Sequence, residues 1–221
     1  MFFAYMMADI MSPLEQLIEL PFDEGGLFGW TSTNYGTFLM GEYIVNVLGF
    51  LLIAGYILDK KGVRFAGTLS ASMMVIGAIV MMIAVSDMFR ASGFHDWLNS
   101  WMKGMPATCK LSFIGFAIFG CGCEMAGTTV SRVLAKWFKG KEMALAMGIE
   151  MAIARLGVTA VMLVIPRISN HYDNSIFAPV TFGTLLLVIG LMNYLIFCMM
   201  DVRFDKQLVA IGEKTEETVN Y

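Results

Sequence analysis

Five charged side chains lie inside long apolar segments of this 221-residue chain, and all but Glu150 are its first candidates for chemistry: Asp9, Glu42, Glu124, Glu150 and Arg155. A charged group inside a membrane costs about 2.5 to 3.5 kcal/mol on insertion scales, so each such residue indicates a functional site by default. A carboxylate and a guanidinium a few ångströms apart offer complementary partners to the two ends of a zwitterion. We therefore predict that the four candidates bind a small zwitterionic solute.

Glu124 and Arg155 are predicted to lie at one depth in the membrane. They are sixteen and fifteen positions from Gly140, which lies in the turn between two predicted antiparallel helices. At 1.5 Å per residue both lie about 22 to 24 Å from that turn, near the midplane where transporters bind their solutes. The alternative is a salt bridge between Glu124 and Arg155 that neutralises both charges and only fixes helix packing.

Asp9 has two interpretations, because the same helical rise places it near mid-depth. It lines a cavity or senses protons, or else it packs against polar neighbours. Glu42 has the same two interpretations. Glu150 lies nearer to the Gly140 turn and is expected to pair with Arg132, so we leave it out of the predicted binding set.

Composition identifies the surroundings of these charges. The chain is 57% apolar and 15% charged, with a mean hydropathy of +0.69, which is typical of a membrane protein. A helix needs roughly 20 apolar residues to cross a membrane, and strands of a barrel would alternate with a period of two, which these runs do not. We predict an all-α membrane protein, a six-helix transmembrane bundle. Its predicted spans are 1–20, 35–58, 65–85, 111–138, 142–165 and 176–200.

The first predicted span is the weakest of the six. Pro13 and several acidic residues interrupt it, and it barely reaches the required length. It looks like the outer part of a span whose beginning is missing. The first helix is therefore expected to be truncated.

Basic residues predict the orientation of the bundle. Ten lysines and arginines, among them Lys60, Lys61 and Arg64, flank one set of span ends, against four at the opposite set. The positive-inside rule places the first set in the cytoplasm. Residues 201–221 then form a cytoplasmic tail. The net charge of −3 does not affect this assignment, and no nucleic-acid partner is indicated.

The remaining reactive residue types indicate no metal site and no cofactor. The four cysteines lie in or beside apolar runs, and the two histidines, His95 and His171, fall in predicted outer connections far from them. A metal site needs more ligands that converge. Sequence motifs of hydrolases and nucleotide-binding proteins are absent.

The predicted outer connection 87–107 carries aromatic residues at intervals of three to five: Phe89, Phe94, Trp97 and Trp101. This spacing predicts a short amphipathic helix at the outer membrane interface, where tryptophan is enriched. The alternative is an ordinary loop with hydrophobic contacts.

A charged interruption, AGYILDKKGVRFAG at residues 54–67, predicts a tight cytoplasmic turn between the second and third spans. Gly55 suits a close helix approach, Asp59 a carboxylate at a helix end, and Gly62 a turn with positive φ. Lys60 and Arg64 hold the turn on the cytoplasmic side. A turn that only fixes topology explains the cations but not the glycine spacing.

The spacing G-x-x-x-D-K-x-G-x-R in this turn resembles the signature between the second and third helices of the major facilitator superfamily. RVLAKWFKGKEMALAMGIEMAIARLG, residues 132–157, is similar to the turn between the fourth and fifth helices of those carriers. In particular, it is similar to the branch containing the lysosomal dipeptide carriers and their bacterial relatives, where a WFKGKE turn is followed by an A-R-[IL]-G stretch. The resemblance covers the whole chain but only the amino-terminal six-helix half of the carrier.

The resemblance implies roles for particular residues. Gly55, Asp59, Lys60, Gly62, Arg64 and Arg132 form the gating motif, whose contacts at the cytoplasmic seam between two bundles hold the outward-open state. Glu124 and Arg155 hold the amino and carboxyl ends of a peptide. The signature of drug antiporters is absent from residues 157–166, which argues against drug export.

The leading prediction is thus a secondary active or facilitative transporter that moves a small zwitterionic or peptide-like solute by alternating access. Its expected partners are the solute, the lipid bilayer and a missing carboxy-terminal six-helix bundle, and its expected location is a bacterial inner membrane. A membrane-embedded enzyme would need a catalytic set that the buried polar residues do not provide. The other alternative is a structural or assembly protein, or a nonfunctional half of a carrier, in which the buried charges only pack.

Overall fold

The computed structural model describes all residues except 25, 103, 139–141 and 211–221, and only the backbone of 208–210. The described residues are almost entirely helical and contain no strand. Four of these helices are long and apolar enough to cross a membrane: Ser32–Ala84, Ala107–Trp137, Met143–His171 and Phe177–Gln207. The prediction of an all-α membrane protein is confirmed. Four such helices appear rather than six, because residues 32–84 form one continuous helical run and residues 1–20 do not form one helix.

The continuous run comprises α3 (Ser32–Val45), η3 (Asn46–Phe50) and α4 (Leu51–Ala84). Its first arm, residues 32–61, runs parallel to α7 (Ala107–Trp137). The Cys109 thiol contacts the Asn34 carbonyl at 3.4 Å, and the Gly120 backbone abuts that of Glu42. Both residue numbers increase together along the contact, which establishes the parallel direction.

The second arm, residues 63–84, runs antiparallel to α7. Gly122 abuts the backbone of Ser70, and Gly115 abuts that of Gly77, so the numbering now runs in opposite directions. The chain reverses at Gly62, where φ is 77° and ψ is 174°. A side chain disfavours this conformation, so the prediction of a positive-φ turn at Gly62 is confirmed.

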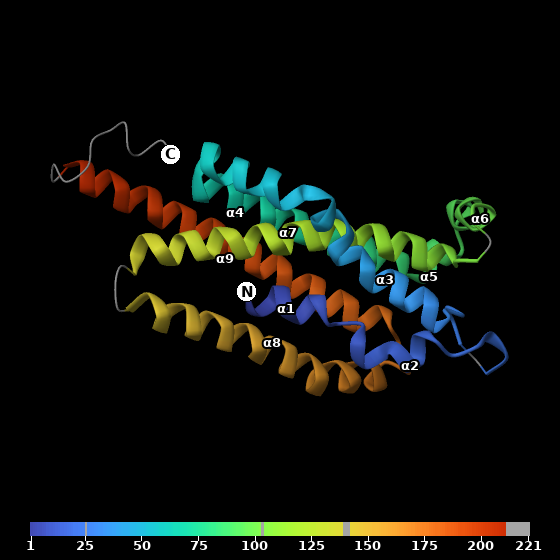
Figure 1. The fold of residues 1–221 in the computed structure, drawn as a ribbon. Coiled ribbons are helices and arrows are strands. Elements are labelled where there is room, and N and C mark those ends of the chain that lie inside the picture. Colours follow the sequence, from blue (N-terminus) through green and yellow to red (C-terminus); the bar gives the residue numbers. More distant parts are fainter. Residues whose placement is uncertain (25, 103, 139–141, 211–221) are drawn as a thin grey trace.

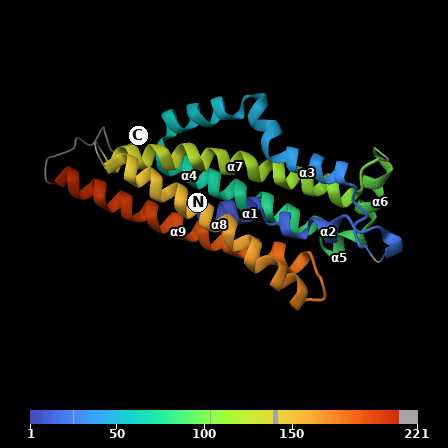
Figure 2. The ribbon, with the colours of Figure 1, turned by 60° about the horizontal axis from the view of Figure 1, so that its bottom comes forward.

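A second glycine bends the first arm. Gly49 in η3 has a φ of 105°, and beyond it the arm leans away from α7 before the second arm returns along it (Figure 2). Val47, Leu48 and Leu52 are at least 80% exposed as a result. The apolar run gave no sign of this bend.

The amino-terminal segment breaks into α1 (Phe2–Ala8), the turn η1 (Ser12–Leu14) and α2 (Glu15–Ile18). Pro13 stands inside η1, where its missing amide hydrogen interrupts the helical hydrogen bonds. The expected single helix over 1–20 is therefore wrong. The segment packs against α8 (Met143–His171) and α9 (Phe177–Ala210), with the chain start in the middle of the bundle (Figure 1).

The expected end of the last span at Met200 also differs from the structure. Helix α9 continues without a break to Ala210, and the carboxylates of Asp201 and Asp205 are buried. Residues 201–210 are therefore helix rather than the start of a tail. The rest of the predicted tail, 211–221, lies outside the described residues, as does the predicted turn at Gly140.

Short helices lie where the chain connects α4 to α7. These are α5 (Asp87–Arg90) and α6 (Gly93–Ser100), capped by the Ser86 and Ser92 side chains. The short helix η2 (Phe22–Glu24) lies at the same end. We call this end of the molecule the α6 end. The end at which the chain reverses at Gly62 is called the Gly62 end. Helix α6 is seen nearly along its axis in Figure 1, so it lies across the direction of the long helices.

Candidate functional site

The four predicted binding residues come from four different segments of the bundle. Asp9 follows α1, Glu42 is in α3, Glu124 in α7 and Arg155 in α8. Asp9 lies within electrostatic range of Arg155 and of Glu42, and Glu42 lies within range of Glu124. The fold thus brings all four into one electrostatic neighbourhood, which we call the charged cluster.

Tyr5 belongs to this cluster, although the sequence reasoning missed it. Its phenol is in electrostatic range of Glu124 and Arg155. It lies one helical turn before Asp9, on the same face of the segment. The i, i+4 spacing of Tyr5 from a carboxylate inside a predicted span was the sequence signal for it.

The tight packing of α3 on α7 positions two of the carboxylates. A Cβ on Gly120 would lie only 2.3 Å from the Glu42 carbonyl oxygen, so the two backbones approach as closely as a glycine permits. Glu124 lies one turn further along α7 on the face of Gly120. Glycine at 120 therefore holds the Glu42 and Glu124 segments together.

No ion pair joins Glu124 to Arg155, although both residues are among those described. The Arg155 residue is exposed in this chain, while Glu124 is half-buried. The described residues also contain no group of three His, Cys, Asp or Glu close enough to hold a metal ion. The described carboxylates are thus not gathered at a single point.

Glu150 does not pair with Arg132 as expected, because Arg132 pairs with Asp59. The Glu150 Oε1 atom is buried and has no hydrogen-bond partner. Glu150 instead lies in electrostatic range of Tyr5. It also lines an otherwise largely apolar cavity of about 500 Å³ between the start of α1, the end of α7 and the start of α8. The structure therefore adds Glu150 to the charged cluster.

The gating motif makes two separate ion contacts at the Gly62 end. Arg132 on α7 donates to the Asp59 carboxylate on the first arm, and both side chains are more than half exposed. The Lys60 ammonium lies 4.9 Å from the ring centre of Tyr56. Among the described residues, a Cβ on Gly55 would meet no atom within 4 Å, so no close helix approach at Gly55 occurs within this part of the chain.

Arg64, by contrast, makes a partly buried contact with α9. Its Nε donates to Asp201 Oδ2 at 2.6 Å, and its Nη2 donates to the Asp201 carbonyl at 3.2 Å and to the Asp205 carboxylate. The Lys136 ammonium lies 3.7 Å from the other Asp201 oxygen. These ion contacts connect the second arm to the last part of α9, and no local sequence pattern predicts them.

The chain is similar to curated proteins named lysosomal dipeptide transporter MFSD1. It is 27% identical over 182 residues to the one from Danio rerio, which covers 78% of this chain and 35% of the relative. It is 31% identical over 114 residues to the Gallus gallus protein, covering 48% and 26%, and 25% identical over 169 residues to the Bos taurus protein, covering 75% and 31%. The aligned chain thus spans about a third or less of the length of these relatives.

No family model matches the chain, and no solved structure matches it. The resemblance to the lysosomal dipeptide carriers, part of the major facilitator superfamily, is nevertheless confirmed by the named relatives. Because these relatives are transporters, they favour transport over enzymatic activity. They are lysosomal proteins of animals, so the expected bacterial inner membrane finds no support among them.

Proposed function

We propose that this chain is the amino-terminal part of a major facilitator transporter that carries a small, zwitterionic, peptide-like solute by alternating access. The observation that carries the proposal is the charged cluster, in which Asp9, Glu42, Glu124 and Arg155 reach one neighbourhood from four segments. Charged side chains inside an apolar bundle cost free energy of insertion, and the binding of a charged ligand is the best explanation for their presence. The names of the relatives suggest a dipeptide.

The arrangement assigns a partner to each end of such a solute. The exposed guanidinium of Arg155 receives the carboxylate, because arginine binds carboxylates through two parallel hydrogen bonds. Asp9, Glu42 and Glu124 surround the amino group. The cluster holds more carboxylates than cations, and Glu150 adds another, so we expect preference for solutes with a second positive charge.

In this proposal the six-helix bundle consists of the segment 1–20, the two arms of the run 32–84, and α7, α8 and α9. A carboxy-terminal six-helix bundle completes the carrier, and the charged cluster faces the seam between the halves. The Gly62 end and the carboxyl end lie in the cytoplasm, as the basic residues indicate. Asp59 and Arg64 then act at the cytoplasmic gate.

The alternative is a structural or assembly protein, or a carrier half without transport activity. Its support is that the aligned chain covers 35% or less of each of these relatives. In that case the charged cluster serves packing alone.

Binding of a labelled lysine-containing dipeptide to the chain in lipid nanodiscs distinguishes the two. We expect saturable binding that the unmodified peptide competes away, and weaker competition from amino-acetylated or carboxyl-amidated peptides. Uptake into vesicles containing the complete parent protein should show the same order. Binding that is unaffected by blocking either end of the peptide would contradict the solute role and support a role of the charged cluster in packing alone.

A further inference from the structure

Helix α6 carries a row of apolar side chains that the described residues leave largely exposed. At 3.6 residues per turn, Phe94, Trp97 and Leu98 share one side of the helix, and Trp101 follows on the same side. Phe94, Trp97 and Trp101 are 51%, 54% and 65% exposed. Their ring centres are 5.6 Å and 5.9 Å apart in sequence order, so the rings support one another in a row. We call these four residues the aromatic stripe.

The opposite side of α6 is polar and faces the rest of the protein. His95 and Asn99 line a cavity of about 510 Å³ at the α6 end, together with Asn34 and Arg90. The Asn99 side-chain oxygen also accepts a hydrogen bond of 2.8 Å from the Ala107 amide at the start of α7. The helix therefore has a fixed rotation, in which the aromatic stripe faces away from the protein.

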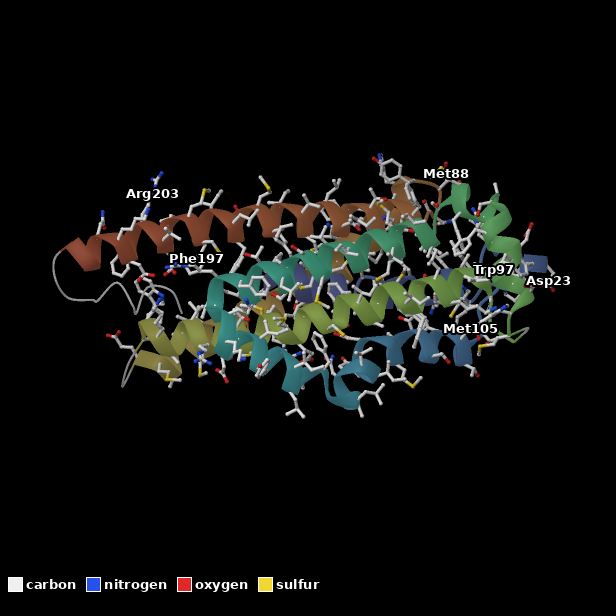
Figure 3. All side chains as sticks on the ribbon, turned by 90° about the horizontal axis from the view of Figure 1, so that it is seen from above. Asp23, Met88, Trp97, Met105, Phe197 and Arg203 are labelled. Atoms are coloured by element: carbon white, nitrogen blue, oxygen red, sulfur yellow. The ribbon has the colours of Figure 1, made fainter. Side chains whose placement is uncertain are left out.

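Lys110 fixes the depth of α6. Its ammonium donates to the Leu98 carbonyl at 2.8 Å and to the Trp101 carbonyl. From Leu111 to Cys123 the helix α7 has no charged residue, so Lys110 marks the level at which α7 enters its apolar span. Helix α6 is thus fastened at the boundary between hydrocarbon and water, and it lies across the long helices (Figures 1 and 3).

The exposed apolar surface continues from α6 onto the spanning helix. Ile114 lies one turn beyond Lys110 on the same face of α7 and is 48% exposed. Met88, which precedes α6 at the same end (Figure 3), is 80% exposed, and Met102 after it is 72% exposed. Exposed apolar side chains of α7 and of the segments flanking α6 thus lie at the same end of the molecule as the stripe.

We propose that α6 is an interfacial helix whose aromatic stripe inserts into the headgroup boundary of the lipid bilayer. Tryptophan suits this position, because its ring is apolar and its N–H group still reaches water or headgroups. The anchor sets the depth of α7 through Lys110 and Asn99, and with it the depth of Glu124. It acts independently of which solute is carried.

Tryptophan fluorescence of the chain in phosphatidylcholine vesicles tests this. The emission lost in W97F/W101F measures the two stripe residues. We expect that component to be quenched at least about twofold by lipids brominated near the top of the acyl chain, and to resist aqueous iodide. The W137F variant is the control, because Trp137 lies at the far end of α7 against Phe204, and its loss should leave the stripe component unchanged.

Two results would overturn the proposal. Strong iodide quenching without an effect of the brominated lipid would place the stripe in water. Protection from both quenchers would mean that protein covers it, for example a second copy of the chain. The single variants W97F and W101F give the same readout where the double variant fails to fold, as checked by circular dichroism.

Discussion

Arg64 holds Asp201 across 137 positions of sequence through a bond of 2.6 Å between its Nε and Asp201 Oδ2. The same guanidinium reaches Asp205 one turn further along α9. The two carboxylate side chains are only 8% and 4% exposed, whereas Arg64 is 28% exposed. A residue of the gating motif thus also neutralises two buried charges within its own bundle.

Arg64→Gln should therefore destabilise the chain by about 3 to 5 kcal/mol, because it leaves buried carboxylates without their main cation. Thermal unfolding in detergent measures the change. Lys61→Gln, an exposed cation three positions earlier, is the control and should have little effect. Adding Asp201→Asn and Asp205→Asn to Arg64→Gln should restore most of the loss, and failure to do so would contradict the electrostatic explanation.

The exposed ion pair of the same motif should behave differently. Asp59→Asn removes the contact with Arg132, yet both side chains are more than half exposed, so the chain should lose no more than about 1 kcal/mol of stability. If Asp59 also makes a gating contact across the seam between the two bundles of the complete carrier, the variant should shift the parent protein toward its inward-open state, because only the outward-open state contains that contact. Cysteine accessibility from outside should fall. Unchanged accessibility and transport would leave Asp59 as a residue that only fixes topology.

One glycine of the second arm and one glycine of α7 provide a test of the packing. A Cβ on Gly77 would lie 2.5 Å from backbone atoms of Gly115 and Phe119, so Gly77→Ala should cost about 1 to 3 kcal/mol. Gly127 lies on α7 with no atom within 4 Å of its Cβ position, and Gly127→Ala should be neutral or stabilise by up to about 1 kcal/mol. Thermal unfolding of both variants measures these changes in stability. Equal effects would mean that the two arms pack on α7 less closely than described.

Local physics made part of the fold predictable. Helix length follows from the apolar runs, and the turn at Gly62 follows from a glycine beside a group of charges. The bend at Gly49 was not predictable, because an isolated glycine in an apolar run has no local signal that separates a bend from a straight helix. The break after α1 was signalled by Pro13, and the prediction of one span there gave hydrophobicity too much weight.

The candidate site was predictable where depth arithmetic applies. Glu124 and Arg155 were placed together by counting from the turn, and the structure puts both in range of Tyr5. Glu150 was assigned to the wrong partner, because counting along a helix gives the depth of a residue but not the face that its neighbours occupy. Contacts such as Arg64 with Asp205 depend on tertiary packing, which a single sequence does not encode in any local pattern.

The solute role of the charged cluster rests finally on Glu124 and Arg155. Each single variant, Glu124→Gln or Arg155→Gln, should greatly reduce transport by the complete parent protein while surface expression is retained, because each removes the partner of one solute end. The selectivity changes should differ. Arg155→Gln should abolish discrimination against carboxyl-amidated peptides, and Glu124→Gln should abolish discrimination against amino-acetylated ones, since specificity for a charged group arises from leaving its buried partner unpaired.

A role in packing alone gives the opposite pattern, which the same measurements detect. Each single change would then lower thermal stability, the double change would recover it, and end-blocking would make no difference to what is carried. The absence of a direct ion pair between Glu124 and Arg155 already argues against mutual neutralisation, because neither charge has the other as its partner in the described structure. Arg155 is exposed in this chain, so its replacement should cost the chain little stability. Normal transport by the double variant would show that the solute role assigned to this pair is wrong.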